Sequence, residues 1–343
     1  MALRIAVIGA TGLVGREVLQ LLHERRVPVD EVVALASGRS AGGKVSFGDE
    51  DLKVGDLASF DFAGFDLAIC AAGAKAVREH APRAAKAGCL VIDDSPAFRL
   101  DPDVPLVVPE INATALARIG KRRLVAVPSP AVVMLATALK PLDDLARARR
   151  VVVTTFEPVS GQSKAAMDEL FDQTRAVYVN QPVERAELPK QIAFNAIPQV
   201  DAFDSDGFTR AEAGLATETR KLLGSDFGLV ATCVRVPVFL GIAAAVTVAF
   251  ERAIDAEAAR RAWRGWHDGE AIGVVDHRVE EGYITPVEVV GEDKVYVSRA
   301  RVDPTVDHGL AFWCAADNVR RGAALTAVRI AELLIEKMPN RAA

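Results

Sequence analysis

A glycine-rich turn near the N-terminus constrains the fold more than any other feature. Gly9, Gly12 and Gly15 have the spacing G-x-x-G-x-x-G, directly after the apolar run Arg4 to Ile8 and directly before an amphipathic segment. Glycines at such points let the backbone turn sharply, approach a pyrophosphate and pack a helix closely on a strand. A glycine triad alone is also typical of any tight strand-to-helix turn. The strand before it and the helix after it favour a dinucleotide site here.

Short apolar runs alternate with amphipathic segments through the first 150 residues. The apolar runs are residues 4–8, 31–36, 67–71 and 90–92, and the amphipathic segments are residues 17–25 and 76–87. This alternation predicts βαβ units. Runs that are apolar throughout, such as Leu67 to Ile69, indicate parallel strands buried on both faces. The first part of the chain is therefore predicted to be an α/β, Rossmann-type domain.

The pattern changes near residue 150. Longer strand-like runs follow at residues 151–155, 231–238, 244–250 and 294–302, and residues 172–191 form a long polar stretch suited to an interface or a lid. A single hydrophobic core stops growing at roughly 250–300 residues, so a chain of this length favours two domains. We predict an α+β second domain with a mixed sheet, and a final helix over about residues 318–338.

The loop after the second predicted strand bears on the choice of cofactor. Where an NAD-preferring site places an acidic residue on the ribose, the chain reads Ser37-Gly38-Arg39-Ser40-Ala41-Gly42. The planar guanidinium of arginine pairs well with phosphate oxygens, so Arg39 between Ser37 and Ser40 suits a 2′-phosphate. A solvated cation on a loop is the other interpretation. We predict NADP(H) in preference to NAD(H).

Composition and charge exclude several classes of protein. The 343 residues include 41 Lys and Arg against 46 Asp and Glu, a formal charge of −5, and no long basic block, which argues against a nucleic acid partner. The most apolar stretches, residues 124–139 and 237–250, are shorter than the roughly 20 residues of a membrane span. No export signal is recognisable before the first strand, so we expect a cytoplasmic protein.

The cysteines and histidines show neither a disulfide framework nor a metal-ligand spacing. They are Cys70, Cys89, Cys233 and Cys314, and His23, His80, His267, His277 and His308. The cysteines lie far apart in apolar or small-residue surroundings, which predicts reduced core thiols. The histidines fall on polar segments, so we expect them at the surface and expect no bound metal.

A series of short segments carries a resemblance to one known family over nearly the whole chain. These segments are Gly9 to Gly12, Ser37 to Gly42, Asp93 to Arg99, Pro105 to Asn112, Ala138 to Leu142, Val159 to Gly161, Phe194 to Gln199, Glu218 to Lys221, Ala231 to Val238 and Asp317 to Ala324. In them the chain closely resembles aspartate-semialdehyde dehydrogenase. Family membership implies reductive dephosphorylation of aspartyl phosphate through a thioester, and a homodimer.

The resemblance also implies a domain division and a set of cofactor contacts. The dinucleotide-binding domain is expected over residues 1–127, with the C-terminal helix at about 318–338 packed back on it. The catalytic and dimerisation domain is expected over residues 128–317. The residues expected to bind the cofactor are Gly9, Thr11, Gly12, Leu13, Val14, Ser37, Arg39, Ser40 and Asn318.

Two positions depart from the family pattern where its chemistry resides. The family carries its thiol nucleophile in an Asn-Pro-Asn-Cys-Ser-Thr stretch, and the corresponding residues here are Val127 to Val132, with Pro130 in the place of the cysteine. The family histidine lies seven residues after an arginine. Arg235 is present, but the seventh residue after it is Ile242. The reaction needs a thiolate and a proton-transfer group, and both are missing at these positions.

Other family positions are partly kept. The substrate-orienting glutamine before Val-Ser-Gly corresponds to Glu157, and an acidic residue and a lysine that hold substrate correspond to Ala211 and Gly214, with Glu212 one residue out of register. Arg99 and Arg235 resemble the arginines that bind phosphate and carboxylate. We therefore predict a remaining anion pocket at Arg99 and Arg235, with an ion-pair role within the fold as the alternative.

The altered segment has the pattern of a helix start. Ser129 is a favourable N-cap residue, and Pro130 suits the first helical position because its missing N–H and fixed φ cost little there. Ser129, Cys70 and Cys233 are the residues that could replace the lost nucleophile. Ser129 has no histidine in a corresponding position, and the two cysteines are interpreted as buried, inert thiols.

These observations predict a family member that binds NADP(H) and has lost the acylating chemistry, similar to the bacterial Usg-type proteins. The alternative is an active NADP-dependent aldehyde or semialdehyde oxidoreductase of amino-acid biosynthesis. Such an enzyme would use an unrecognised nucleophile or a mechanism without a thioester. Similarity of fold alone does not decide between the two, because one fold carries many functions.

Overall fold

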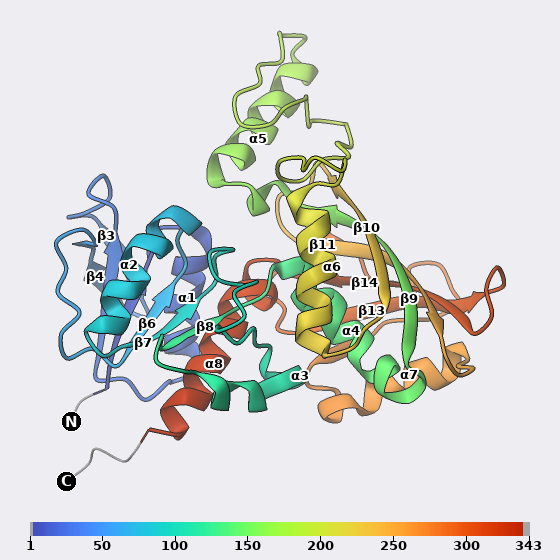
Figure 1. Ribbon diagram of the computed structural model, residues 1–343. Helices are drawn as coiled ribbons and strands as arrows, with labels where there is room; N and C mark the ends of the chain where they lie inside the picture. Colours follow the sequence, from blue (N-terminus) through green and yellow to red (C-terminus); the bar gives the residue numbers. More distant parts are fainter. Residues whose placement is uncertain (1–2, 339–343) are drawn as a thin grey trace. The chain divides into compact units, whose positions relative to one another are not determined.

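The computed structural model describes residues 3–338. Two compact units divide these residues, one made of residues 3–129 and 322–338 and the other of residues 130–321. Figure 1 traces the elements of each unit along the chain. A six-stranded sheet forms the centre of each unit.

The sheet of the first unit is parallel throughout and has the order β5-β2-β1-β6-β7-β8. Its strands are β1 (Arg4–Ile8), β2 (Glu31–Ala36), β5 (Gly55–Asp56), β6 (Leu67–Cys70), β7 (Leu90–Asp93) and β8 (Leu124–Ala126), and a separate hairpin joins β3 (Lys44–Phe47) to β4 (Glu50–Lys53). Every residue of β6 is buried, as expected of a parallel strand covered on both faces. The predicted Rossmann-type sheet is confirmed.

Helices pack on this sheet through their apolar faces. They are α1 (Leu13–Glu24), α2 (Ala74–Lys86) and α8 (Leu325–Glu336). The short helix α3 (Pro109–Asn112) lies against α8 and the 3-10 turn η1 (Ala113–Arg118). Helix α8 belongs to this unit although it lies at the far end of the sequence, and Arg25 after α1 forms a bidentate ion pair with Glu332. The prediction of a single helix from about residue 318 is wrong in detail, because a π-helical turn over Arg320–Ala324 precedes α8.

The sheet of the second unit is mixed, with the order β10-β9-β11-β14-β13-β12. Its strands are β9 (Ala148–Glu157), β10 (Gly228–Arg235), β11 (Ile242–Phe250), β12 (Ile272–Val274), β13 (Val295–Asp303) and β14 (Gly309–Ala316). The predicted mixed sheet is confirmed. Strands β12 and β14 were not among the predicted runs.

Helices of the second unit cover one face of this sheet. They are α4 (Pro130–Ala146), α6 (Arg210–Leu223) and α7 (Ala256–Gly265). The unit also contains α5 (Lys164–Tyr178) and the short turns η2 (Val159–Gly161), η3 (Trp266–Gly269) and η4 (Pro286–Val289). Trp263 of α7 is fully buried and donates its indole N–H to the Ala138 carbonyl of α4. On the opposite face, side chains such as Thr154, Ala245 and Trp313 remain partly or fully exposed.

The polar stretch at residues 172–191 begins inside a helix. Helix α5 starts after Ser163, whose hydroxyl accepts the Ala166 N–H, and ends at Tyr178. It shares a small core with the chain that follows, including Leu170 and Ile192, and Figure 1 shows it standing apart from the sheet of its own unit. Helix α5 and the chain that follows it therefore form a projecting part of the second unit with a small core of their own.

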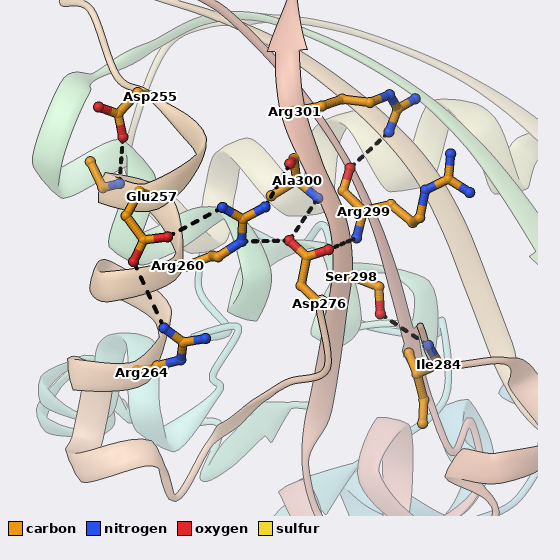
Figure 2. Close-up of polar contacts among 11 residues, drawn as sticks. Asp255, Glu257, Arg260, Arg264, Asp276, Ile284, Ser298, Arg299, Ala300 and Arg301 are labelled. Carbon is orange, nitrogen blue, oxygen red and sulfur yellow. Dashed lines mark hydrogen bonds and ion pairs between the residues drawn. The ribbon is translucent and has the colours of Figure 1, made fainter. Parts of the chain in front are cut away.

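A strained bulge interrupts β13 beside β14. Arg299 has φ +59°, an unusual value for a residue with a side chain. The carboxylate of Asp276 accepts the backbone N–H groups of Arg299 and Ala300 at 2.7 and 3.1 Å, and Arg260 donates to the same carboxylate at 2.7 Å. Figure 2 shows this network, with the Arg299 and Arg301 side chains directed away from Arg260. The buried ion pair holds the bulge in place.

Candidate functional site

The glycine turn after β1 requires its glycines for steric reasons. Gly9 has φ +82°, and a Cβ there would lie 2.4 Å from the Ala71 carbonyl oxygen. A Cβ at Gly15 would lie 2.2 Å from the Gly9 carbonyl oxygen. Both distances are shorter than a Cβ and a carbonyl oxygen can approach each other. Only glycine therefore fits at positions 9 and 15.

The N-terminus of α1 offers unused donors toward this turn. Gly12 is the N-cap residue, no side chain caps the helix, and no acidic residue lies in its first turn. Thr11, Leu13 and Val14 are partly exposed around it. Backbone N–H groups and the helix dipole attract an anion at such a site. These residues fit the pyrophosphate of a dinucleotide.

The loop after β2 carries an exposed arginine, Arg39. Ser37 and Ser40 are joined by a tight turn, with the Ser40 N–H 2.8 Å from the Ser37 carbonyl. Arg39 is exposed and makes no hydrogen bond or ion pair among residues 3–338. Sequence reasoning missed Asp56, which pairs with Ala36 in the neighbouring strand and lies close to Gly38. Its carboxylate already accepts the Ala58 N–H and the Ser59 hydroxyl.

Two carboxyl groups and an arginine occupy the segment after β7. Asp93 Oδ1 accepts the Ser95 N–H, while Asp93 Oδ2 and Asp94 Oδ1 are buried without a hydrogen-bond partner in the described chain. Burial raises the pKa of Asp93, and burial together with the Asp93 charge raises the pKa of Asp94 to about 7. Arg99 is 8% exposed and donates to the carbonyls of Val127 and Asp94 at 2.9 and 2.6 Å.

The sequence analysis expects Pro130 and Ile242 at the positions of the family's thiol and imidazole, and both residues lie at the start of regular elements. Pro130 is the first residue of α4, as the helix-start pattern predicts, and Ser129 beside it is half-buried. Ile242 begins β11 and is 2% exposed. A proline ring and a buried alkyl side chain have neither a nucleophilic atom nor a titratable proton.

All four cysteines are buried and unpaired, as predicted. Burial raises the pKa of the Cys89 thiol to about 11. It raises the pKa values of the Cys233 and Cys314 thiols to about 12. Burial also raises the pKa of Cys70 well above its ordinary value. Among residues 3–338 none of the four thiols forms a hydrogen bond with a histidine. A thiolate at neutral pH is therefore not available from any of them.

Arg235 lies on β10 directly opposite Glu157 on β9. Arg235 is 3% exposed; its Nη1 donates to the Pro158 carbonyl at 2.6 Å and lies 3.9 Å from Glu157 Oε2. Burial raises the pKa of Glu157, and the charge of Arg235 opposes that rise. Arg99 belongs to the first unit and Arg235 to the second, so they come from separate parts of the fold.

The remaining family positions have structural partners. Glu212 completes a capping box with Thr209 at the start of α6, and its other oxygen accepts the Cys233 N–H at 3.0 Å. Asn318 accepts the Gly241 N–H and donates to the Ser160 hydroxyl, both at 3.0 Å, within the second unit. Ala211 and Gly214 on α6 offer no charged group.

One histidine prediction is wrong. His80 on α2 is 7% exposed, because it lies on the helix face that packs toward the sheet, and its pKa is lowered by burial. The other four are exposed. Within residues 3–338 no cluster of three or more His, Cys, Asp or Glu side chains could hold a metal ion. Nor does any helix in that range combine the length and apolarity needed to cross a bilayer.

Comparison with family models matches both units. Residues 4–119 match the semialdehyde dehydrogenase NAD binding domain, and residues 139–321 match the semialdehyde dehydrogenase dimerisation domain. The first unit therefore carries a dinucleotide-binding domain and the second a dimerisation domain. The matches also confirm the predicted two-domain α/β fold.

Individual relatives cover nearly the whole length of the chain. The chain is 45% identical to an aspartate-semialdehyde dehydrogenase of Rickettsia conorii over 331 residues, which are 96% of this chain and 97% of the relative. It is 41% identical to that of Aquifex aeolicus over 98% of this chain and 99% of the relative. A crystal structure from Vibrio cholerae, of aspartate semialdehyde dehydrogenase II complexed with ASA, is similar with a TM-score of 0.95. The identity is 39%, over 99% of this chain and 100% of that one.

Proposed function

The chain belongs to the aspartate-semialdehyde dehydrogenase family, and we propose that it binds NADP(H) and a small anion without performing the family's acylating reaction. In this proposal it is a Usg-type pseudoenzyme of the cytoplasm. Its cofactor residues are those of the α1 turn, the Arg39 loop and Asn318. Its anion ligands are Arg99 and Arg235.

One observation carries this proposal: the first turn of α4 begins with Pro130. The reaction requires a thiolate at that position to form a covalent intermediate, and proline has no atom that can do so. The buried thiols elsewhere in the described chain are protonated at neutral pH, which removes the obvious substitutes. The decisive experiment is an assay of phosphate-dependent NADPH formation from aspartate semialdehyde and NADP.

The NADP assignment gives a direct prediction. We expect NADPH to bind more tightly than NADH, because Arg39 is exposed and unpaired beside two serines. Charge-assisted hydrogen bonds contribute about 1.5–3 kcal/mol, so Arg39→Ala should weaken NADPH binding by at least tenfold and leave NADH binding nearly unchanged. Calorimetric titration of both cofactors measures this. Arg118→Ala, at another exposed arginine of the same unit, is the matched control. Equal affinity for the two cofactors in the unaltered protein would contradict the assignment.

The second prediction concerns the homodimer. The exposed sheet face of the second unit carries small and apolar side chains, including Val152, Phe156 and Trp313, as expected of a surface that packs on a second copy. We expect a dimer by light scattering at micromolar concentration. Ala245→Glu, in the middle of this face, should shift the protein to monomer, whereas Ala63→Glu on the first unit should not. A monomeric unaltered protein would refute the prediction.

An active oxidoreductase is the second candidate, and the names of the relatives favour it. Proteins 41–45% identical over nearly the whole chain are named aspartate-semialdehyde dehydrogenase. This candidate requires a nucleophile other than a cysteine, for which Ser129 is the nearest residue, or a reaction without a thioester. Turnover that depends on Ser129 would favour it.

A further inference from the structure

A buried carboxyl group lies against the arginine on which the anion site depends. Strands β9 and β10 are parallel and in register, so that Glu157 and Arg235 are direct neighbours. Arg235 is 3% exposed, and the Glu157 side chain is 15% exposed. Two opposite charges this close and this poorly hydrated influence each other more strongly than a surface pair would.

Glu157 and Arg235 form no direct hydrogen bond with each other. Arg235 Nη1 donates to the Pro158 carbonyl at 2.6 Å, and the Thr155 hydroxyl donates to Glu157 Oε1 at 3.1 Å. The closest approach between the pair is 3.9 Å, which is too long for a hydrogen bond. Glu157 therefore compensates the arginine's charge without occupying its donors.

The η2 turn places a residue without a side chain next to the Arg235 guanidinium. Gly161 in the η2 turn is exposed, and a Cβ at this position would lie 3.2 Å from Arg235 Nη1. The missing side chain keeps the turn from crowding the guanidinium. A small anion approaching from this side would meet the guanidinium and the Glu157 carboxyl together.

Few other charged groups lie around Glu157. From β10 it faces Arg235 and the Cys233 thiol, and from its own strand the Thr155 hydroxyl. Glu212 on α6 lies behind Cys233, with its two oxygens bonded to the Thr209 and Cys233 N–H groups. Cys233 stays protonated, since its pKa is raised to about 12. Glu157, whose pKa is raised by burial, is thus the carboxyl group that lies beside Arg235.

We propose that Glu157 makes anion binding at Arg235 depend on a proton. An incoming carboxylate and an ionised Glu157 would place two negative charges on one buried guanidinium, which is strongly unfavourable. If Glu157 takes one proton from solvent, its carboxyl becomes an O–H donor and can bond the anion. Binding then consumes one proton, and Glu157 determines which protonation state accepts ligand. This inference rests on the proposed function, because it assumes an anion site at Arg235.

Trifluoroacetate is a suitable probe, since it stays ionised throughout pH 5–9 and is observed directly by ¹⁹F NMR. In the unaltered protein its affinity should fall about tenfold for each pH unit above the pKa of Glu157, as one coupled proton requires. In Glu157→Gln, which keeps the shape without the charge, the affinity should be independent of pH. Above the pKa of Glu157 this variant should bind more tightly than the unaltered protein, by a factor that grows about tenfold for each pH unit.

Two controls complete the experiment. Glu270→Gln removes an exposed carboxyl group of the same unit that has no side-chain partner in the described residues, and should reproduce the unaltered pH slope. Arg235→Met should abolish binding. If that variant does not fold, the comparison of Glu157→Gln with Glu270→Gln decides the question without it.

The inference is overturned by equal pH slopes in Glu157→Gln and the unaltered protein, or by no trifluoroacetate binding in either. NADPH titration and the turnover assay on the same samples separate the two proposals. Retained NADPH binding without turnover leaves the proposed function standing while the proton coupling fails. Phosphate-dependent turnover rejects the proposed function whatever the probe shows.

Discussion

Purified protein is expected to show no phosphate-dependent oxidation of aspartate semialdehyde by NADP above background. The covalent route divides a difficult acyl transfer into two easier steps, and Pro130 offers no atom to begin it. Ile242 supplies no imidazole, and a positioned proton-transfer group alone contributes roughly 10²–10⁴-fold in rate. The measurement is NADPH formation at 340 nm. The Vibrio cholerae relative, assayed in parallel, is the positive control.

Restoring the thiol alone should not restore the reaction. In Pro130→Cys the thiol would have no imidazole at position 242, and Ala211 and Gly214 would still lack the charges that hold substrate. We therefore expect no rate above background from Pro130→Cys. The opposite finding would be turnover by the unaltered protein that survives replacement of all four cysteines and is lost in Ser129→Ala. That result would identify a serine-based enzyme.

The second large effect is on stability, through Asp94. Burial, reinforced by the charge of Asp93, raises the pKa of Asp94 to about 7, whereas an unfolded aspartic acid titrates near about 3.9. The folded protein therefore holds the proton more tightly than the unfolded chain. This contribution to stability is fully present below about pH 4, declines as pH rises, and is lost above about pH 7.

Asp94→Asn keeps the shape of the side chain and removes its titration. Three pKa units correspond to about 4 kcal/mol, so we expect this variant to be more stable than the unaltered protein at pH 8 by about 2–4 kcal/mol. At pH 4 the two should differ little. Urea denaturation from pH 4 to pH 8 measures both. Asp103→Asn, at an exposed position, should follow the unaltered protein. If Asp94→Asn loses as much stability between pH 4 and pH 8 as the unaltered protein does, Asp94 is not the group responsible for that loss.

Local patterns were enough to predict most of the first unit. The run 31–36 corresponds to β2, and the turn after β1 needs glycine at Gly9 and Gly15, as the spacing indicates. Strand β14 was missed because its sequence, Gly309 to Ala316, contains glycine and several alanines, residues with low strand propensity. It forms a strand because β11 and β13 pair with it on both sides.

In the candidate site, too, features set by local sequence could be predicted, and features set by distant neighbours could not. Pro130 at the head of α4 could be predicted, because proline suits the first turn of a helix whatever surrounds it. The pairing of Glu157 with Arg235 could not, since it depends on the register of two strands separated by the whole of α5 and α6. The burial of Asp94 Oδ1 likewise depends on neighbours that no local pattern identifies.

The return of α8 to the first unit has a consequence for how the protein is made. Residues 130–321 form one uninterrupted stretch and can fold as they emerge from the ribosome, because domains generally fold as units during synthesis. The nucleotide-binding unit must wait, since the helix that carries Val328, Ile330 and Leu334 into its core is translated after residues 130–321. This unit is thus completed only after the unit that interrupts it in the sequence. Premature termination before α8 would leave the apolar surface beside α1 without its cover.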